Sequence, residues 1–199
     1  MKSLMIAAGA AMLLGGCATN ARDSGMAGPA AMAMSEAARM YMRMASSGDM
    51  FEIESSRLAL QMSRNEAVRS FAQMMIADHT RMSNEMMEAA RQAGLEPPPM
   101  QMAPHHADML NRLRAAGPNQ FDMMYHDAQV AAHQEALNLH RGYASAGDNP
   151  TLRALAARAA PAVEMHLGQL QTHGTHMRTA PMQPQPQAEP PRRRAGERG

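Results

Sequence analysis

The fold is decided by residues 93–118, which read AGLEPPPMQMAPHHADMLNRLRAAGP. Gly94 is the residue type that most often follows a helix end in the left-handed conformation. The prolines at 97–99 cannot continue a helix, because proline has no backbone N–H to donate. A short helix is predicted over residues 104–115, and Pro118 is a favoured first residue for the next long helix. The resulting connection of about two dozen residues is long enough to cross the length of a helical bundle.

Long helical segments lie on both sides of this connection. Their expected ranges are 35–62, 65–93, 118–144 and 149–173. Ser35, Asn65 and Asn149 are suitable N-caps, and Pro161 is expected to bend the last helix. Within each pair of helices the join is a few residues, which makes the paired helices antiparallel neighbours. Two hairpins with one long crossover between the second and third helices predict an all-α, ferritin-like four-helix bundle over residues 35–173.

The composition agrees with a helical fold in one domain. The chain has 199 residues, of which 24 are Met and only 3% are aromatic. Residues that favour strands are scarce, whereas Ala, Met, Leu, Arg and Gln, which favour helix, are frequent. The formal net charge of +1 gives no bulk attraction to nucleic acid, so nucleic acid is not an expected partner.

The N-terminus has the pattern of a lipoprotein signal peptide. Lys2 precedes an apolar run from Leu4 to Leu14, which is too short to span a bilayer but suits a signal-peptide core. Leu14-Gly15-Gly16-Cys17 then resembles a bacterial lipobox, in which the thiol of the Cys receives a lipid. A plain secretory signal with an incidental Cys17 is the alternative. We expect residues 1–17 to be the signal region, with Cys17 as the membrane anchor.

The segments on either side of the bundle differ from it in composition. Residues 18–34 are rich in Ala, Gly, Ser and Met and are expected to form a flexible tether. Residues 174–199 are rich in Pro, Gln and Arg and are expected to be disordered. Ala18 follows the lipobox where an Asp would favour the inner membrane. In a Gram-negative host this pattern predicts an outer-membrane lipoprotein that faces the periplasm.

Five short pieces of sequence carry a resemblance to a known family. They are GDMFEIE at 48–54, VRSFAQMMIADH at 68–79, FDMMY at 121–125, AQVAAH at 128–133 and PAVEMHL at 161–167. With these pieces in this order, residues 35–173 resemble the bacterial ferritin-like "domain of unknown function 4142" family of exported proteins. The resemblance implies a four-helix bundle and export, and it brings no established reaction.

One polar residue near the middle of each long helix is a candidate metal ligand: Glu52, His79, His133 and His166. In an antiparallel bundle such positions meet at one level, where imidazoles and a carboxylate can bind Cu, Zn, Fe or Mn. Asp78 and Glu164 are expected as acceptors that fix the imidazole tautomers. The alternative is a set of inward polar residues that hydrogen-bond to one another without a metal.

The sequence departs from the di-iron pattern of ferritins. That pattern needs Glu-x-x-His on two helices, but Ile76, Val130 and Val163 stand three residues before the three His. Iron storage and ferroxidase activity are therefore not expected. A catalytic thiol is not expected either, because the only cysteine is assigned to lipidation.

A second candidate metal site is peripheral and rich in Met and His. Its residues are Met100, Met102, His105, His106, Met109, His173, His176 and Met177. Thioethers and imidazoles suit copper, whereas Met is also an adaptable core filler in helices. Both interpretations are open from the sequence.

Three functions follow from these observations. The first is a non-enzymatic envelope protein, attached to a membrane by its lipid, that binds a partner or supports stress tolerance. The second is a metal-binding protein, using either of the two candidate sites. The third is a metal-dependent oxidoreductase, for which no further cofactor signature is present.

Overall fold

The structure is a computed structural model that describes residues 34–179, with side chains as far as residue 172. Cys17, the signal region, residues 18–33 of the expected tether and residues 180–199 of the expected tail lie outside the described residues. The side chains of His173, His176 and Met177, which were assigned to the peripheral copper site, also lie outside them.

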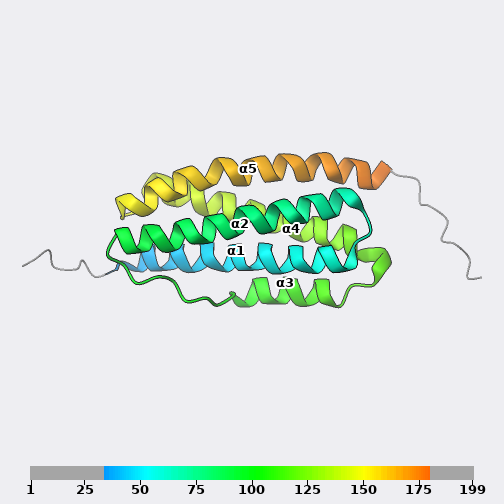
Figure 1. The fold of residues 1–199 in the computed structure, drawn as a ribbon. Helices are drawn as coiled ribbons and strands as arrows, with labels where there is room; N and C mark the ends of the chain where they lie inside the picture. The colour runs from blue at the N-terminus through cyan, green and yellow to red at the C-terminus, as the bar shows by residue number, and fades with distance from the viewer. Residues whose placement is uncertain (1–33, 180–199) are drawn as a thin grey trace, which may run out of the picture. The chain divides into compact units, whose positions relative to one another are not determined.

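Helices make up nearly all of the described part of the chain (Figure 1). They are α1 (Glu36–Met62), α2 (Glu66–Gln92), α3 (Pro104–Arg114), α4 (Pro118–Ala146) and α5 (Pro150–Thr179). The short helix predicted inside the long connection is therefore present as α3. The last helix continues through Pro161 and runs to Thr179, beyond the end expected near His173.

The helix ends are set by local sequence. The side chain of Ser35 accepts a hydrogen bond from the backbone N–H of Ala38, and Asn65 does the same for Ala67. Asn149 accepts from the N–H of Leu152 at the start of α5. Each cap satisfies an N–H that the first turn of a helix leaves unpaired. After α2, Gly94 adopts a φ of 66°, which a residue with a Cβ rarely adopts.

The four long helices form two antiparallel hairpins that pack side by side. α1 packs against α2 and α4, and α5 packs against α4 and α2. Tyr41 near the start of α1 contacts His140 near the end of α4, and Ser56 contacts Tyr125 near the start of α4. α1 and α4 are therefore antiparallel, and the helices run up, down, down and up in chain order. This arrangement confirms the predicted ferritin-like bundle with one long crossover.

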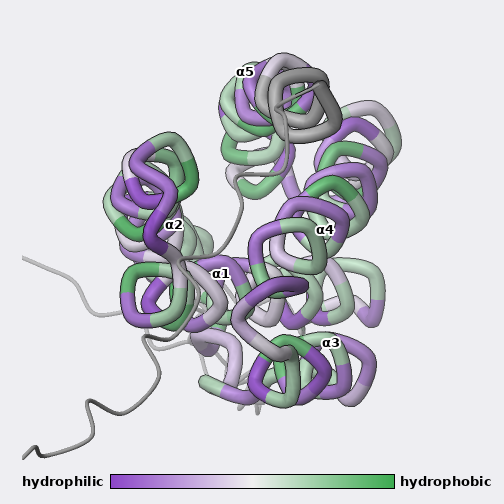
Figure 2. The backbone as a smooth tube through the Cα atoms, turned by 90° about the vertical axis from the view of Figure 1, so that its right-hand side faces the viewer, coloured by the Kyte–Doolittle hydropathy of each residue, from purple (hydrophilic) through white to green (hydrophobic). Residues whose placement is uncertain are grey.

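The crossover lies along the bundle and covers one side of it. α3 packs against α1 and α4, and the end-on view in Figure 2 shows it beside these two helices and away from α5. Leu110 and Leu113 of α3 are buried in the core. The crossover thus contributes apolar contacts in addition to joining the hairpins. No helix in the part of the chain described here is apolar over a long enough window to cross a membrane.

The core is apolar toward both ends of the bundle and polar in the middle. One end holds Phe51, Phe71, Met75, Phe121 and Tyr125 among its buried residues. The other holds Tyr41, Met42, Met86, Tyr143 and Leu152. Between these ends lie buried polar side chains: Asp49, Glu52, His79, Gln129, His133 and His166. Polar groups at this depth need partners, because burial without a hydrogen bond is costly.

The core position of Met75 gives a test of methionine as a packing residue. Met75 is fully buried in the first apolar cluster, whereas Met165 of α5 is 50% exposed. Met75→Ala should lower the free energy of unfolding by about 2–5 kcal/mol, because it leaves a cavity. Met165→Ala, the matched control, should change it by less than about 0.5 kcal/mol. Urea denaturation of both variants measures the difference, and equal losses would contradict a packing role for Met75.

Candidate metal centre

Three imidazoles from three helices meet in the polar middle of the bundle. His79 comes from α2, His133 from α4 and His166 from α5, and all three are buried. Their ring centroids are 5.5 Å apart for His79 and His133, 5.6 Å for His79 and His166, and 5.3 Å for His133 and His166. One nitrogen of each ring lies within 4.8 Å of the corresponding nitrogens of the other two. The structure therefore brings together three of the four predicted ligands.

His79 is held by a carboxylate on α1. Its Nδ1 lies 2.8 Å from Oδ1 of Asp49, and Oδ2 of Asp49 accepts a hydrogen bond of 3.1 Å from the hydroxyl of Ser83. The Nδ1–H of His79 therefore donates to Asp49. The other nitrogen, Nε2, is buried and has no hydrogen-bond partner among the described residues.

His166 is held by Asp78 of α2. Nε2 of His166 lies 3.0 Å from Oδ2 of Asp78, whose other oxygen accepts from Arg81 at 3.2 Å. Nε2–H of His166 thus donates outward, and its Nδ1 faces His133 Nε2 at 3.3 Å. Asp78 occupies the position that the sequence suggested, as the acceptor that fixes an imidazole.

His133 is held by the backbone of its own helix. Its Nδ1 lies 2.9 Å from the carbonyl oxygen of Gln129, one turn earlier in α4. Nδ1–H therefore donates to that carbonyl, and Nε2 carries the lone pair that faces His166. This bond uses the spacing of four residues that places side chain and carbonyl on one face of a helix.

Each ring thus has an outward nitrogen with an acceptor and an inward nitrogen that faces the other rings. An ion with His–metal bonds of about 2.0–2.1 Å in tetrahedral geometry separates its nitrogen ligands by about 3.3 Å. The 3.3 Å between His133 Nε2 and His166 Nδ1 matches that separation. Carboxylate and carbonyl partners on the far side of the rings are the usual companions of metal-bound imidazoles.

The protonation of the three rings differs because their surroundings differ. Burial lowers the pKa of His133 to about 3. Burial also lowers the pKa of His166, against the opposing effect of Asp78. For His79 burial acts in the same direction, but the hydrogen bond and charge of Asp49 outweigh it and raise the pKa. His133 and His166 are therefore neutral at neutral pH, which is the form of imidazole that binds metals.

Glu52 lies beside the three rings but not among their inward nitrogens. Its Oε1 is 3.3 Å from Nδ1 of His133, whose N–H points instead at the Gln129 carbonyl. Neither carboxylate oxygen has a hydrogen-bond partner in the described structure. The expectation that Glu52 is a ligand equal to the three His is therefore corrected, because the rotation of α1 turns it toward the outer nitrogen of His133. Burial raises the pKa of Glu52 to about 7, partly offset by the nearby His79.

The acceptors around the rings were only partly predicted. Glu164 was expected to fix an imidazole, but it is exposed and forms an ion pair of 2.8 Å with Arg141, which corrects that expectation. Asp49 and the Gln129 carbonyl were missed. Asp49 stands three residues before Glu52, which places both on one face of α1. That spacing was the available signal for Asp49, whereas a backbone acceptor leaves no signal in the sequence.

The peripheral methionines and histidines form a different group from the one expected. His105 and His106 of α3 face Glu135 of α4, with His105 Nε2 at 3.1 Å and His106 Nε2 at 3.8 Å from its carboxylate. Met102 and Met109 pack against the apolar core, as filler residues do. Met100 is exposed. The described part of this site therefore pairs imidazoles with a carboxylate, which corrects the expected grouping with thioethers.

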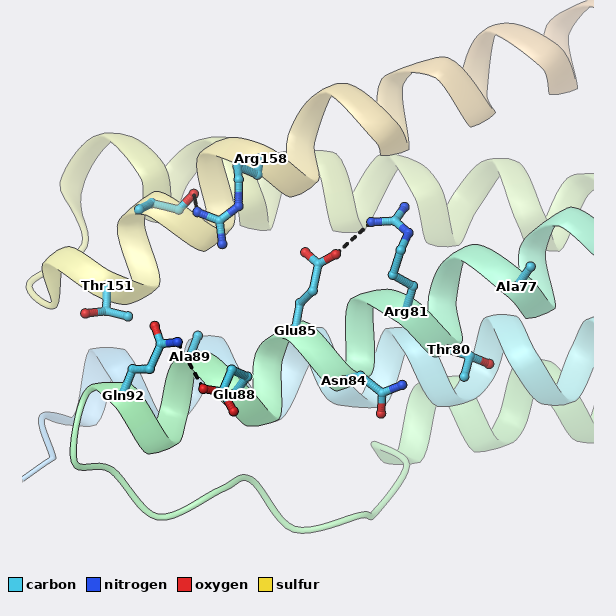
Figure 3. A pocket seen from close by; sticks show the side chains of 11 residues that line it. Ala77, Thr80, Arg81, Asn84, Glu85, Glu88, Ala89, Gln92, Thr151 and Arg158 are labelled. Carbon is cyan, nitrogen blue, oxygen red and sulfur yellow. Dashed lines mark hydrogen bonds and ion pairs between the residues drawn. The ribbon is translucent and has the colours of Figure 1, made fainter.

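A shallow groove lies between α2 and α5, away from the rings. Its volume is ≈ 750 Å³, and its lining includes Arg81, Glu85, Glu88, Gln92 and Arg158 (Figure 3). These side chains are largely satisfied by one another: Arg81 pairs with Glu85 at 2.8 Å, and Gln92 donates to Glu88 at 3.0 Å. None of the three imidazoles is among its lining residues. The groove is therefore a solvated charged surface that is separate from the three imidazoles.

The buried carboxyl of Glu52 gives a pH-dependent test of the centre without metal. The pKa of Glu52 is raised from 4.5 to about 7, so its contribution to stability is complete below pH 4.5 and is lost as the pH rises toward 7. The loss amounts to about 3 kcal/mol, because each pKa unit corresponds to about 1.36 kcal/mol. Glu52→Gln does not titrate, so its free energy of unfolding relative to the wild type should rise by that amount over this range.

Urea denaturation of both proteins in chelator, at several pH values between 4.5 and 7.5, measures this difference. Taking the difference between the two proteins removes the contributions of groups that do not interact with Glu52, whereas the coupled titration of His79 remains in it. A difference that stays constant with pH would show that Glu52 is ionised in the folded chain near pH 5.

Comparison with known proteins places this chain in a family. No curated protein and no solved structure matches the chain. The family described as "Domain of unknown function (DUF4142)" matches residues 24–172, a span that contains α1 to α4, most of α5 and all three imidazoles. Since the match covers well over half of the sequence, the chain belongs to the DUF4142 family.

Proposed function

We propose that this chain is an envelope-anchored metal-binding protein that holds one divalent transition-metal ion between His79, His133 and His166. A single observation carries the proposal: in each buried ring one N–H has a fixed acceptor, and one nitrogen from each of the three rings lies within 4.8 Å of the other two. Without an ion, the lone pairs of His133 Nε2 and His166 Nδ1 face each other at 3.3 Å. Two lone pairs at this distance repel each other, and an ion or a proton placed between the two nitrogens removes the repulsion.

The donor set indicates which ions suit the site. Imidazoles in their neutral form are borderline ligands that bind Zn²⁺, Cu²⁺, Ni²⁺ and Fe²⁺, and a bound ion would displace any proton from the inward nitrogen of His79. The site has no bridging carboxylate pair of the kind that di-iron proteins use. Zn²⁺ is the first ion to test, because three protein ligands with an open fourth position are a common arrangement for it.

The space beside the rings favours binding over turnover. Glu52, His79 and His133 line a cavity of ≈ 20 Å³. A cavity of this kind holds about one water molecule, since one water needs about 10–15 Å³. An organic substrate has no room there, so the oxidoreductase hypothesis receives no support from the cavity.

The metal proposal predicts a stoichiometry and a stabilisation. Full-length protein in detergent should bind Zn²⁺ at the three rings, and free Zn²⁺ at about 100 times the Kd should raise the free energy of unfolding by about 2.7 kcal/mol. His133→Ala and His166→Ala should each remove the part of this stabilisation that comes from the ion at the three rings. Elemental analysis, combined with urea denaturation with and without Zn²⁺, measures both effects.

The chain offers matched controls for these variants. His140 lies seven residues after His133 on the same helix and is also buried, but its Nδ1 pairs with the hydroxyl of Tyr41 at 3.1 Å. His140→Ala should therefore retain Zn²⁺ binding. Asp49→Asn, which weakens the support of His79, should reduce affinity by about 10–100-fold without abolishing binding. Protein that holds no metal, and whose stability ignores Zn²⁺, Cu²⁺, Fe²⁺ and Mn²⁺, would overturn the proposal and leave a hydrogen-bonded cluster.

The anchor is proposed from the lipobox alone. Leu14-Gly15-Gly16-Cys17 supports lipidation of Cys17, and Ala18 supports the outer membrane. In a Gram-negative host fed an alkyne-labelled fatty acid, the wild-type chain should carry the label and Cys17→Ser should not. Ala18→Asp is the matched control, since it should keep the label but move the protein to the inner membrane. Labelling of Cys17→Ser equal to that of the wild type would refute the anchor.

A further inference from the structure

A second group of metal-binding side chains lies at the surface, where the crossover meets α4. His105 and His106 are consecutive residues of α3, and Glu135 comes from α4. One ligand atom from each lies within 4.8 Å of the other two. Two imidazoles and a carboxylate are a donor set that proteins use for Zn²⁺ with an open fourth position.

The ring of His106 is held in place from behind. Its Nδ1 lies 2.7 Å from the hydroxyl of Ser47, which also accepts the backbone N–H of Ala103 at 2.7 Å. The ring stacks on Phe51, with centroids 5.5 Å apart and an interplanar angle of 16°. These contacts leave Nε2 of His106 facing Glu135 at 3.8 Å, which exceeds a hydrogen bond. Atoms at this separation are close enough to share an ion.

The group is open to solvent on one side and closed on the other. The side chain of His105 is 43% exposed and that of Glu135 is 42% exposed, whereas His106 is buried. An ion from solvent therefore meets His105 and Glu135 first, and His106 is the ligand nearest to the interior.

One small cavity is lined by residues of this surface group and by two of the three central rings. The lining of this cavity of ≈ 20 Å³ includes His106 and Glu135 of the surface group, His79 and His133 of the central rings, and Glu52. Neither oxygen of Glu52 has a hydrogen-bond partner among the described residues. The lining thus offers a buried carboxylate beside residues of both groups, in a space that fits about one water molecule or ion.

We propose that His105, His106 and Glu135 form a second divalent-cation site that captures an ion at the surface and passes it along this cavity, by way of Glu52, to the three central imidazoles. The transfer rests on the proposed function, whereas the surface site does not. The alternative is a structural role alone, in which His105 and Glu135 pair to join α3 to α4. In that case the group would bind no metal, and its removal would not change the rate at which the central site takes up an ion.

The surface site is tested in a chain that lacks the central one. Full-length His133→Ala/His166→Ala in detergent, titrated with Zn²⁺ against a chromogenic chelator, should still bind one equivalent. Adding His105→Ala and Glu135→Gln should remove that equivalent. Adding Glu164→Gln instead, the exposed carboxylate paired with Arg141, should retain it. Helical circular dichroism shows whether each variant is folded, and a folded central-site variant without bound Zn²⁺ would overturn the surface site.

The transfer is tested by the rate of loading. Stopped-flow mixing of metal-free chain with Zn²⁺ should show slower filling of the central site in His105→Ala/Glu135→Gln, by about tenfold or more. The final occupancy of the central site should be unchanged, and Glu164→Gln should load like the wild type. Equal rates in all three proteins would overturn the transfer. A wild-type central site that never fills would overturn the proposed function separately, since the surface equivalent is measured without it.

Discussion

The burial of three imidazoles in the middle of a helical bundle is the constraint on which the rest of this structure depends. A buried N–H without an acceptor is costly, so each ring must place one N–H against an oxygen. Asp49, Asp78 and the Gln129 carbonyl provide these oxygens, and each comes from the outer side of the group. With the outer nitrogens engaged, the inner nitrogens have only one another to face. The metal proposal therefore rests on which nitrogen of each ring carries the N–H, and not only on the presence of three histidines.

The path of the crossover explains why a second group of ligands lies at the surface beside the bundle. In a bundle with three short loops, no segment would lie along the side of α1 and α4. Here α2 and α4 run in the same direction, so the segment that joins them must return along the length of the bundle. Its helix α3 covers the side formed by α1 and α4. The same segment carries His105 and His106 to Glu135, next to a cavity whose lining also includes His79 and His133. The connection required by the topology thus also places a group of ligands at the surface.

The apolar ends of the bundle allow a polar middle. Aromatic and methionine side chains are buried on both sides of the centre, and these clusters stabilise the helices against the cost of burying Glu52 and the imidazoles. Glu52 shows that cost most clearly, because burial raises its pKa to about 7 and its oxygens accept no hydrogen bond from the residues that the structure describes. A site that is incompletely satisfied in the middle of a stable scaffold is typical of binding centres.

The sequence by itself determined the helices, their caps and the crossover, because each depends on residues close together in the chain. Ser35, Asn65 and Asn149 cap helices through hydrogen bonds to residues two or three positions away, and Gly94 ends α2 through its own backbone conformation. The sequence also indicated that His79, His133 and His166 lie at one level. Only the tertiary structure decided which way each helix is rotated, and a step of one residue turns a side chain by about 100° around a helix. That rotation turned Glu164 to solvent and Glu52 to the outer side of His133, and it set Asp49 against His79 and Glu135 against the histidines of the crossover.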